Sequence, residues 1–544
     1  MCAIADSDKV KLSALTNLLM AVRNDFYAGY AMRIHARSDQ RLHQAVNRPC
    51  VIVAGWSFLL AVAALALTFP VQLAAATARP NVLFIAADDL RTDLGCYGNT
   101  EVKTPQLDAL ARRGVVFERA YCQQAVCNPS RASVLTGRRP DTLKVWDLQA
   151  HFRETLPDVV TLPQHFKEQG YTAIGIGKIF HNESGSRMRK FPFADPPSWS
   201  RPPVHASGAH WQDWVVPGDP AGPKQKAGAV QAVDAPDNAY FDGQIADQAC
   251  EALREFGRSK EPFFLVVGFW KPHLPFNAPK KYWDLYDRTK LTPRDTEVMP
   301  KGAPAIAKHR GTELRNYEGV PKDGPIPREQ IAELRHGYYA GISFLDAQVG
   351  RVLDALREAD LAANTLIVFW SDHGFHLGEH DLWGKTSNYE LDARVPLIVA
   401  GPGIAPNARS AALVELIDLY PTIVDAARLP AAAGVEGRSL GALLREPRGR
   451  GAEFAVTQHP HPFYGGKPTH MGYAIRDERY RYVEWRELTS GAITARELYD
   501  HSMDPRETVN RIDHPTNRSI AERMATRAAG VVSRGGRWPN LTQR

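Results

Sequence analysis

The 544-residue sequence predicts an α/β fold, in which helices flank a large, mainly parallel central sheet and a smaller C-terminal antiparallel-sheet subdomain follows. Two observations predict the large sheet. Apolar, strand-like runs alternate with helix-like segments, and several of these runs end in Asp, His or Lys. A third observation predicts the subdomain, because from about residue 450 short alternating segments are separated by turn residues, and a polar helix follows near residues 519–532.

The first half of the sheet is predicted by short apolar runs and capped helices. Residues 81–89 (NVLFIAADD) have the pattern of a buried central strand with two carboxylates at its carboxyl end, where ligands gather in open α/β sheets. Residues 104–111 predict a helix with Thr104 as its N-cap and Pro105 at its first position. Residues 162–170 predict a helix closed by Gly170, and the strand 171–176 follows.

The second half repeats this alternation. Further strands are predicted at 262–269, 365–370 and 395–400, and further helices at 240–256, 328–359 and 416–427. We expect the 328–359 helix to be broken near Gly337 or Gly341. Two proline-rich excursions, 182–238 and 277–327, are irregular. We interpret the first as a long surface segment suited to substrate contacts or partial disorder.

The N-terminal region has the pattern of an export signal. Residues 50–69 are almost uninterruptedly apolar, and Ala76-Thr77-Ala78 resembles a signal-peptidase site. A run of this length can also span a bilayer, so an uncleaved anchor is the alternative. We therefore predict an N-terminal extension (1–46), a signal peptide or membrane anchor (47–78), a main domain (79–447) and a C-terminal subdomain (448–544). The protein is expected to be periplasmic or secreted, or else anchored in the membrane by residues 50–69.

Composition excludes several classes of protein. Hydrophobic residues at 44% and charged residues at 23% are typical of a globular chain, not a disordered one. The formal net charge is +6, but no dense Lys/Arg run is interleaved with aromatic residues, so we expect no nucleic-acid partner. Two of the six cysteines precede residue 79. The remaining four are too few for a fold held together by disulfides, although one bridge is possible.

Residues 127–137 (CNPSRASVLTG) are the most informative stretch. Pro129 is suited to the first turn of a helix, which would place Cys127 at the positive end of the helix dipole. Anions bind and thiols are activated at that position. Arg131 follows Cys127 by four residues, close enough to reach the same end of the helix. A cysteine before a helix is ordinarily a plain buried residue, so the chemistry depends on the whole string.

That string resembles the signature of the sulfatase family, C-x-P-S-R-x-x-x-L-T-G, at every defined position. The resemblance implies the formylglycine-dependent sulfatase fold within the alkaline phosphatase-like superfamily, with residues 79–447 as the catalytic domain. It also implies that a maturation enzyme oxidises Cys127 to Cα-formylglycine, whose hydrated aldehyde is the nucleophile.

Asp88-Asp89 and Asp372-His373 follow two different predicted strands and would meet if both strands are central. Either pair alone is more often a turn or a helix cap. Three carboxylates with one further donor suit a hard divalent cation, Ca²⁺ before Mg²⁺. Both pairs resemble the sulfatase metal site, which implies that these four residues and the group formed from Cys127 hold the ion.

Further polar residues match sulfatase positions that contact sulfate or transfer protons. Transfer of a sulfuryl group develops charge on its oxygens and on the departing alcohol, so cations and a proton donor are required. The resemblance implies that Arg131 supports the hydrate and the metal geometry. Its implied roles for the other positions are sulfate binding by Lys178 and Lys385, protonation of the leaving alcohol by His273, and removal of a proton by His181 so that sulfate is released.

Further stretches resemble the iduronate-2-sulfatase group of the family. They include GKIFH (177–181), KPHLPF (271–276) and LGEH (377–380), and the resemblance covers about residues 80–510. It implies a sulfated sugar or glycosaminoglycan substrate. Phe375-His376 and the two proline-rich excursions depart from that group. Two alternatives remain open: a phosphatase or phosphonate hydrolase of the same superfamily, and a non-catalytic sulfated-glycan binding protein if Cys127 is not converted.

Overall fold

The computed structural model describes residues 79–181, 194–206, 228–291 and 298–534. The extension and the signal or anchor segment predicted at 1–46 and 47–78 therefore lie outside the described residues. None of the helices in the described part combines the length and the hydropathy needed to cross a bilayer.

The large sheet has eight strands in the order β10-β2-β11-β7-β1-β5-β3, with β12 paired to β2. Four adjacent strands are parallel to one another, in the order β7, β1, β5 and β3. Strand β11 runs antiparallel to its two neighbours, β2 and β7. The mainly parallel sheet predicted from the sequence is thus confirmed. The strands are β1 (Asn81–Asp88), β2 (Gly114–Tyr121), β3 (Thr172–Gly177), β5 (Phe263–Pro272), β7 (Thr365–Ser371), β10 (Arg394–Val395), β11 (Leu397–Ala400) and β12 (Ala408–Glu415).

The register of the parallel strands brings their carboxyl ends to one edge. Ala87 at the end of β1 is paired with Ser371 of β7, and Asp88 with Pro272 of β5. Gly177 at the end of β3 is paired with Gly268 of β5. Residues that directly follow these four strands are consequently neighbours in space.

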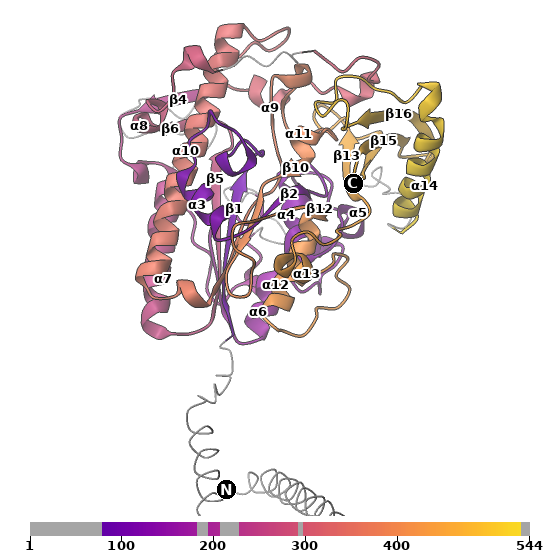
Figure 1. The fold of residues 1–544 in the computed structure, drawn as a ribbon. Helices are drawn as coiled ribbons and strands as arrows, with labels where there is room; N and C mark the ends of the chain where they lie inside the picture. Colours follow the sequence, from indigo (N-terminus) through magenta and orange to yellow (C-terminus); the bar gives the residue numbers. More distant parts are fainter. Residues whose placement is uncertain (1–78, 182–193, 207–227, 292–297, 535–544) are drawn as a thin grey trace, which may run out of the picture. The chain divides into compact units, whose positions relative to one another are not determined.

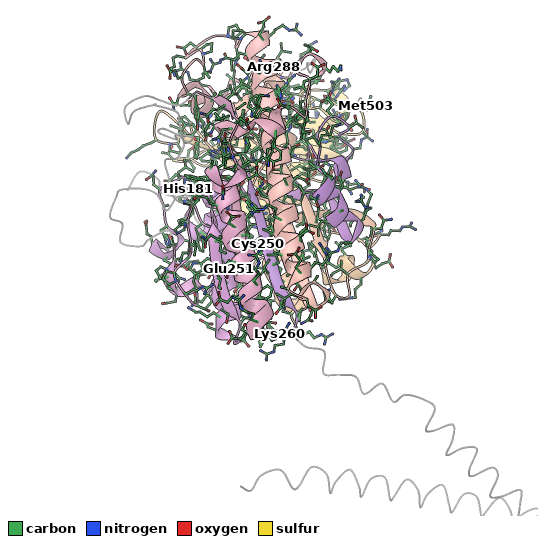
Figure 2. The ribbon with its side chains drawn as sticks, turned by 90° about the vertical axis from the view of Figure 1, so that its left-hand side faces the viewer. His181, Cys250, Glu251, Lys260, Arg288 and Met503 are labelled. Carbon is green, nitrogen blue, oxygen red and sulfur yellow. The ribbon has the colours of Figure 1, made fainter. Side chains whose placement is uncertain are left out.

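Helices cover both faces of this sheet (Figure 1). α3 (Pro105–Arg112), α7 (Phe241–Ser259) and α10 (Arg328–Glu358) pack on one face, and their apolar side chains form one buried cluster with alternate residues of the strands. α4 (Cys127–Thr136), α6 (Leu162–Glu168) and α12 (Leu419–Ala426) form the second cluster on the other face. Figure 2 labels Cys250 and Glu251 along α7, and Lys260 just past its last residue.

Short elements connect these layers. The short helices are α5 (Pro140–Leu143), α8 (Lys280–Trp283), α9 (Thr312–Arg315), α11 (Glu390–Ala393) and α13 (Gly441–Arg445). Two small sheets pair β4 (Val230–Val233) with β6 (Phe276–Pro279), and β8 (His376–Leu377) with β9 (Trp383–Gly384).

A separate four-stranded antiparallel sheet forms the C-terminal part, as the sequence predicts. Its order is β13 (Ala455–His461), β14 (His470–Arg476), β15 (Tyr480–Glu487) and β16 (Ile493–Asp500). α14 (Arg518–Arg534) packs on it through Met524 and Ala528. Hydrogen bonds that join this sheet to the large domain include those from Thr457 Oγ1 to the Cys122 carbonyl (2.7 Å) and from the Gln458 amide to the Gln123 carbonyl (2.9 Å).

The expected break in the 328–359 helix is wrong, because α10 is continuous from Arg328 to Glu358. Its glycines serve close packing instead. A Cβ at Gly337 would lie 2.9 Å from the Cβ of Phe276, and one at Gly341 would lie 3.5 Å from the Cβ of Pro272. The propensity of glycine to interrupt a helix is overridden by this tertiary packing.

Thr104 occupies the N-cap position of α3, but its side chain does not cap the helix. Its Oγ1 instead accepts a hydrogen bond from the Gly95 amide (2.9 Å). The first amides of α3 are satisfied by Asp346 of α10, which accepts hydrogen bonds from the amides of Gln106 (3.1 Å) and Leu107 (2.7 Å). A partner 240 positions away cannot be found from local sequence.

Candidate active site

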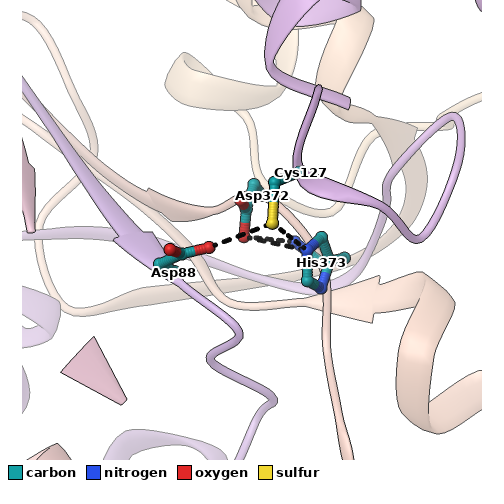
Figure 3. A group of neighbouring side chains, drawn as sticks. All are labelled: Asp88, Cys127, Asp372 and His373. Carbon is teal, nitrogen blue, oxygen red and sulfur yellow. Dashed lines mark hydrogen bonds and ion pairs between the residues drawn. The ribbon is translucent and has the colours of Figure 1, made fainter. Parts of the chain in front are cut away.

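The carboxyl ends of β1 and β7 place four predicted residues together, and Figure 3 shows three of them, Asp88, Asp372 and His373, beside Cys127. Asp88 ends β1 and Asp89 follows it, whereas Asp372 and His373 follow β7. The Asp89 amide donates to Asp372 Oδ1 (3.2 Å), and Nε2 of His373 lies 3.4 Å from Asp89 Oδ1. Asp89 has a positive φ of 63°, which turns the chain sharply at the end of the strand. All four side chains are fully buried.

Cys127 is the first residue of α4, as predicted, and Pro129 lies in the first turn. The Sγ atom of Cys127 is 3.2 Å from His373 Nε2 and 3.4 Å from Asp88 Oδ1. Burial, and then the negative charge of Asp88, raise the pKa of the thiol well above its usual value. Burial and Asp88 thus oppose any activation of this thiol by the helix dipole. The thiol is protonated at neutral pH and is itself a poor nucleophile.

The donor set fits a divalent cation. One atom each of Asp88, Cys127, Asp372 and His373 lies within 4.8 Å of the others. His373 Nδ1 lies 2.9 Å from the Gly374 carbonyl, so Nδ1 carries the proton and Nε2 presents its lone pair to the cluster. Buried carboxylates of this density are ordinarily paired or bound to a metal. Asp89, with Cys127 and His273, forms an adjoining group of the same kind.

Arg131 reaches back from α4 to the strand ends. Its Nε donates to Asp372 Oδ2 (2.7 Å), and Nη2 lies 3.7 Å from Asp88 Oδ1. The remaining donors bond backbone carbonyls, including that of Lys178 (2.6 Å). Every one of these contacts orients a carboxylate or a strand end. The guanidinium is fully buried, so it acts on the cluster electrostatically and not as a surface cation.

Two buried lysines flank the carboxylates. Lys178, directly after β3, forms an ion pair with Asp88 and lies over the Trp270 ring at 4.5 Å from its centroid. Lys385, directly after β9, is 3.0 Å from Asp89 Oδ1. Burial opposes the charge on Asp88, but Lys178, with other nearby cations, holds its pKa well below the usual value. At Asp89 burial raises the pKa of the carboxyl, and the opposite effect of Lys385 does not cancel this increase.

The two predicted proton-transfer histidines lie after β5 and β3. Nδ1 of His273 is 2.5 Å from the Leu274 carbonyl, and its Nε2 faces the cluster, 3.9 Å from Asp89 Oδ2. His181 is buried, and burial together with the charge of Lys178 lowers its pKa well below the usual value. His181 is thus a neutral imidazole over a wide pH range, although the same burial and charge make it a weaker base than a free histidine.

Sequence reasoning missed Glu313. This residue lies on α9, within the second proline-rich excursion, and its carboxylate bridges two predicted site residues. Oε2 is 2.8 Å from Lys385 Nζ, and Oε1 is 3.1 Å from His273 Nε2. No periodicity or motif surrounds Glu313 in the sequence, so only the folded chain identifies it.

Another group of possible ligands, Glu390, His501 and Glu507, lies away from the strand ends. Its two carboxylates are already paired with Arg481, whose Nε donates to Glu507 Oε1 (2.6 Å) and whose Nη2 donates to Glu390 Oε2. This group is accordingly a buried ion-pair network and not a competing metal site.

Comparisons with known proteins identify the family of this chain. The family profile described as sulfatase matches residues 80–429, and one described as the C-terminal part of N-sulphoglucosamine sulphohydrolase matches residues 378–533. Human iduronate 2-sulfatase is 35% identical over an alignment that covers 79% of this chain and 90% of that protein.

Solved structures share the fold at lower identity. The phosphonate monoester hydrolase of Agrobacterium radiobacter superposes with a TM-score of 0.68 at 22% identity, covering 84% of this chain and 96% of that one. A protein solved with its substrate D-glucosamine-2-N,6-O-disulfate gives a TM-score of 0.67 at 21% identity, covering 85% and 100%. At these identities the likeness concerns the fold alone.

Proposed function

Since the chain belongs to the sulfatase family of sulfuric ester hydrolases, we propose that it removes sulfate from a sulfated sugar or glycosaminoglycan, through a formylglycine nucleophile and a divalent metal. The observation that carries this proposal is the cluster of Asp88, Cys127, Asp372 and His373, whose ligand atoms lie within 4.8 Å of one another. The human relative at 35% identity is an iduronate 2-sulfatase by name, which supports an anionic sugar as the substrate class.

The nucleophile is proposed to arise from Cys127 by oxidation. A protonated thiol among carboxylates attacks sulfur poorly, whereas Cα-formylglycine at the same position supplies a hydrated aldehyde with a nucleophilic hydroxyl. Conversion requires a maturation enzyme, which is the partner that this proposal implies.

The metal is proposed to be Ca²⁺ before Mg²⁺, held by Asp88, Asp89, Asp372, His373 and the group formed from Cys127. Oxygen-rich, irregular ligand sets of this kind suit Ca²⁺ better than the small octahedral Mg²⁺. A bound cation supplies Lewis acidity and lowers the pKa of a hydroxyl beside it. Arg131, bonded to Asp372, keeps that carboxylate in a fixed orientation.

The chain's own cations are proposed to hold the sulfate group. Lys178 and Lys385 each form an ion pair with a cluster carboxylate, which supports their proposed role because both ammonium groups lie beside the cluster. His273 presents Nε2 on the same side and donates a proton to the oxygen of the departing alcohol, which becomes a neutral leaving group when the S–O bond breaks. His181, a neutral imidazole, then accepts the proton of the remaining hydroxyl of the sulfated hydrate, so that the C–O bond to sulfate breaks and the aldehyde forms again.

The remaining organisation is also proposed. Residues 79–447 form the catalytic domain and 448–544 the C-terminal subdomain, and residues 47–78 direct export as a signal peptide or anchor.

Parallel assays test the proposed reaction. The purified, Ca²⁺-loaded protein is expected to release sulfate from sulfated uronic acids and hexosamines, with 2-O-sulfated iduronate tested first, and to hydrolyse matched phosphate and phosphonate esters far more slowly. Cys127→Ala with its metal bound is the control and should be inactive. A faster phosphate or phosphonate reaction would make the protein a phosphohydrolase. Binding of the glycan without turnover by protein with an unconverted Cys127 would make it a lectin-like protein.

A further inference from the structure

Glu313 lies where the alcohol part of a substrate would sit. Its carboxylate bonds Lys385 Nζ at 2.8 Å and His273 Nε2 at 3.1 Å, the same two groups that face the sulfate and the leaving oxygen in the proposed function. Its side chain is 22% exposed, whereas those of Asp88, Asp89 and Asp372 are completely buried. Glu313 thus forms the outer wall of the site and the metal carboxylates form its floor.

The support beneath Glu313 is rigid. Its neighbours Leu314 and Tyr317 are buried in the main core cluster, and Arg315 donates to the carbonyls of Pro321 (2.7 Å) and Gly324 (2.7 Å). Gly311, directly before α9, has a positive φ of 62° and fits closely against Trp383, whose carbonyl oxygen would lie 3.3 Å from an added Cβ. α9 is drawn above the large sheet in Figure 1. These contacts anchor the segment that carries the carboxylate.

The charge of Glu313 is maintained in this position. Burial opposes ionisation, but Lys385 and His273 hold the pKa of the carboxyl below its usual value. An ionised carboxylate has no proton to donate and accepts hydrogen bonds only. A substrate group facing Glu313 must therefore be a donor, and a second anion there would be repelled.

The place of that donor follows from His273. In the proposed reaction, His273 Nε2 directs its proton to the ester oxygen and no longer to Glu313 Oε1. Glu313 Oε1 then lacks this hydrogen-bond partner but still lies beside the ester oxygen. In a six-membered sugar ring, the group on the carbon next to the sulfated carbon stands gauche to the ester oxygen and within hydrogen-bond distance of it unless both groups are axial. We propose that Glu313 is a specificity-determining residue that accepts a hydrogen bond from a vicinal hydroxyl or amino group of the substrate.

This inference rests on the proposed sulfate-ester hydrolysis and narrows its substrates to sulfate esters with a neighbouring hydrogen-bond donor, as in carbohydrates. Hydrogen bonds to a charged group discriminate by about 10- to 100-fold. A site built to bond a substrate hydroxyl rejects the analogue that lacks it, because its own polar group is then left unpaired.

Two matched substrates test the proposal: a 2-O-sulfated hexoside and its 3-deoxy analogue. Their leaving oxygens differ little in basicity, so the demand on His273 is similar for both. We expect the wild-type enzyme to favour the hydroxylated sugar by about 10-fold or more in kcat/KM. In Glu313→Ala this preference should fall below about 3-fold, and in Glu313→Gln to an intermediate value, because the neutral amide oxygen is a weaker acceptor.

The controls separate this inference from the proposed function. Glu318→Gln changes an exposed carboxylate five positions along the same segment and should keep the wild-type preference. Thermal midpoints of the Glu313 variants within a few degrees of wild type show that they fold. Equal losses on both substrates, or an unchanged preference in Glu313→Ala, would overturn the specificity role while the sulfatase assignment stands. No turnover of either ester by the formylglycine-containing wild type would overturn the proposed function and this inference together.

Discussion

At the scale of single residues, the chemistry depends on how burial and neighbouring charges set protonation. Cys127 begins α4, yet burial and Asp88 keep it a thiol. Lys178 remains an ammonium although burial lowers its pKa, because Asp88 and other neighbouring groups, Asp372 among them, together raise the pKa by more. The site therefore holds cations and carboxylates in fixed pairs before any substrate arrives, and such preorganised charge is what a sulfuryl transfer needs.

The contribution of His273 to kcat/KM is expected to increase with the basicity of the leaving alcohol. His273→Gln should lower kcat/KM for sugar sulfates by about 100- to 10,000-fold, since an alkoxide leaves poorly without a proton. Aryl sulfates release an acidic phenol as its anion, so the kcat/KM of His273→Gln for these substrates should fall much less. Steady-state kinetics over a series of leaving groups measure this, with the exposed His514→Gln as the control variant. A uniform loss across the series would show that His273 is not the general acid.

Most of the candidate site could be predicted residue by residue, because Asp88, Asp89, Asp372 and His373 directly follow apolar runs. The structure brings Cys127, Arg131, Lys178, His273 and Lys385 to the same place. Glu313 could not be predicted. Its position depends on how an irregular segment packs against Trp383 and the core, and no sequence period encodes such long-range contacts.

At the scale of helices and strands, the strand ends of the large sheet were predictable but the supports of its helices were not. β1, β5 and β7 are wholly or almost wholly buried apolar runs, so their existence follows from composition and length. In contrast, the continuity of α10 depends on Gly337 and Gly341, which leave room for the side chains of Phe276 and Pro272. The start of α3 depends on Asp346, a carboxylate from another helix.

Asp346 gives a pH-dependent prediction for this helix contact. Burial raises its pKa to about 7, so the native state binds more protons than the unfolded state between about pH 4 and pH 7. The free energy of unfolding must then fall as pH rises through that window, by at most about 1.4 kcal/mol per pH unit from this group. Asp346→Asn cannot ionise and retains an acceptor for the Leu107 amide.

The measurement is the difference in thermal midpoint between wild type and Asp346→Asn at pH 5 and pH 8. We expect wild type to be relatively more stable at pH 5 and to lose that advantage by pH 8. Asp354→Asn, an exposed position on the same helix, is the control and should give a constant difference. If the difference in thermal midpoint between wild type and Asp346→Asn were the same at pH 5 and pH 8, Asp346 would be ionised over this whole pH range.

At the scale of the whole molecule, two core clusters on opposite faces of one sheet fix the strand ends, and the C-terminal sheet packs beside them. Three fully buried carboxylates at those ends are costly unless they are paired. A cation that binds the native state and not the unfolded chain adds about 2.7 kcal/mol at 100 times its dissociation constant.

Metal removal should therefore lower both the stability and the activity of the protein. Treatment with a chelator is expected to reduce the thermal midpoint by a few degrees and to abolish sulfate release, with Ca²⁺ restoring both more effectively than Mg²⁺. Differential scanning calorimetry follows the first effect. Asp372→Asn removes one ligand, and its midpoint should no longer respond to chelator. An equal response in that variant would place the ion elsewhere.

The most direct test of the account is the mass of the tryptic peptide 120–131, which contains Cys127, in a preparation that hydrolyses sulfate esters. Conversion to formylglycine makes this peptide lighter by about 18 Da, because CH₂SH is replaced by CHO. Cys122 in the same peptide stays a thiol and marks complete alkylation. We predict that sulfate turnover rises in proportion to the lighter peptide. Full turnover by protein whose Cys127 is entirely unmodified would contradict the account.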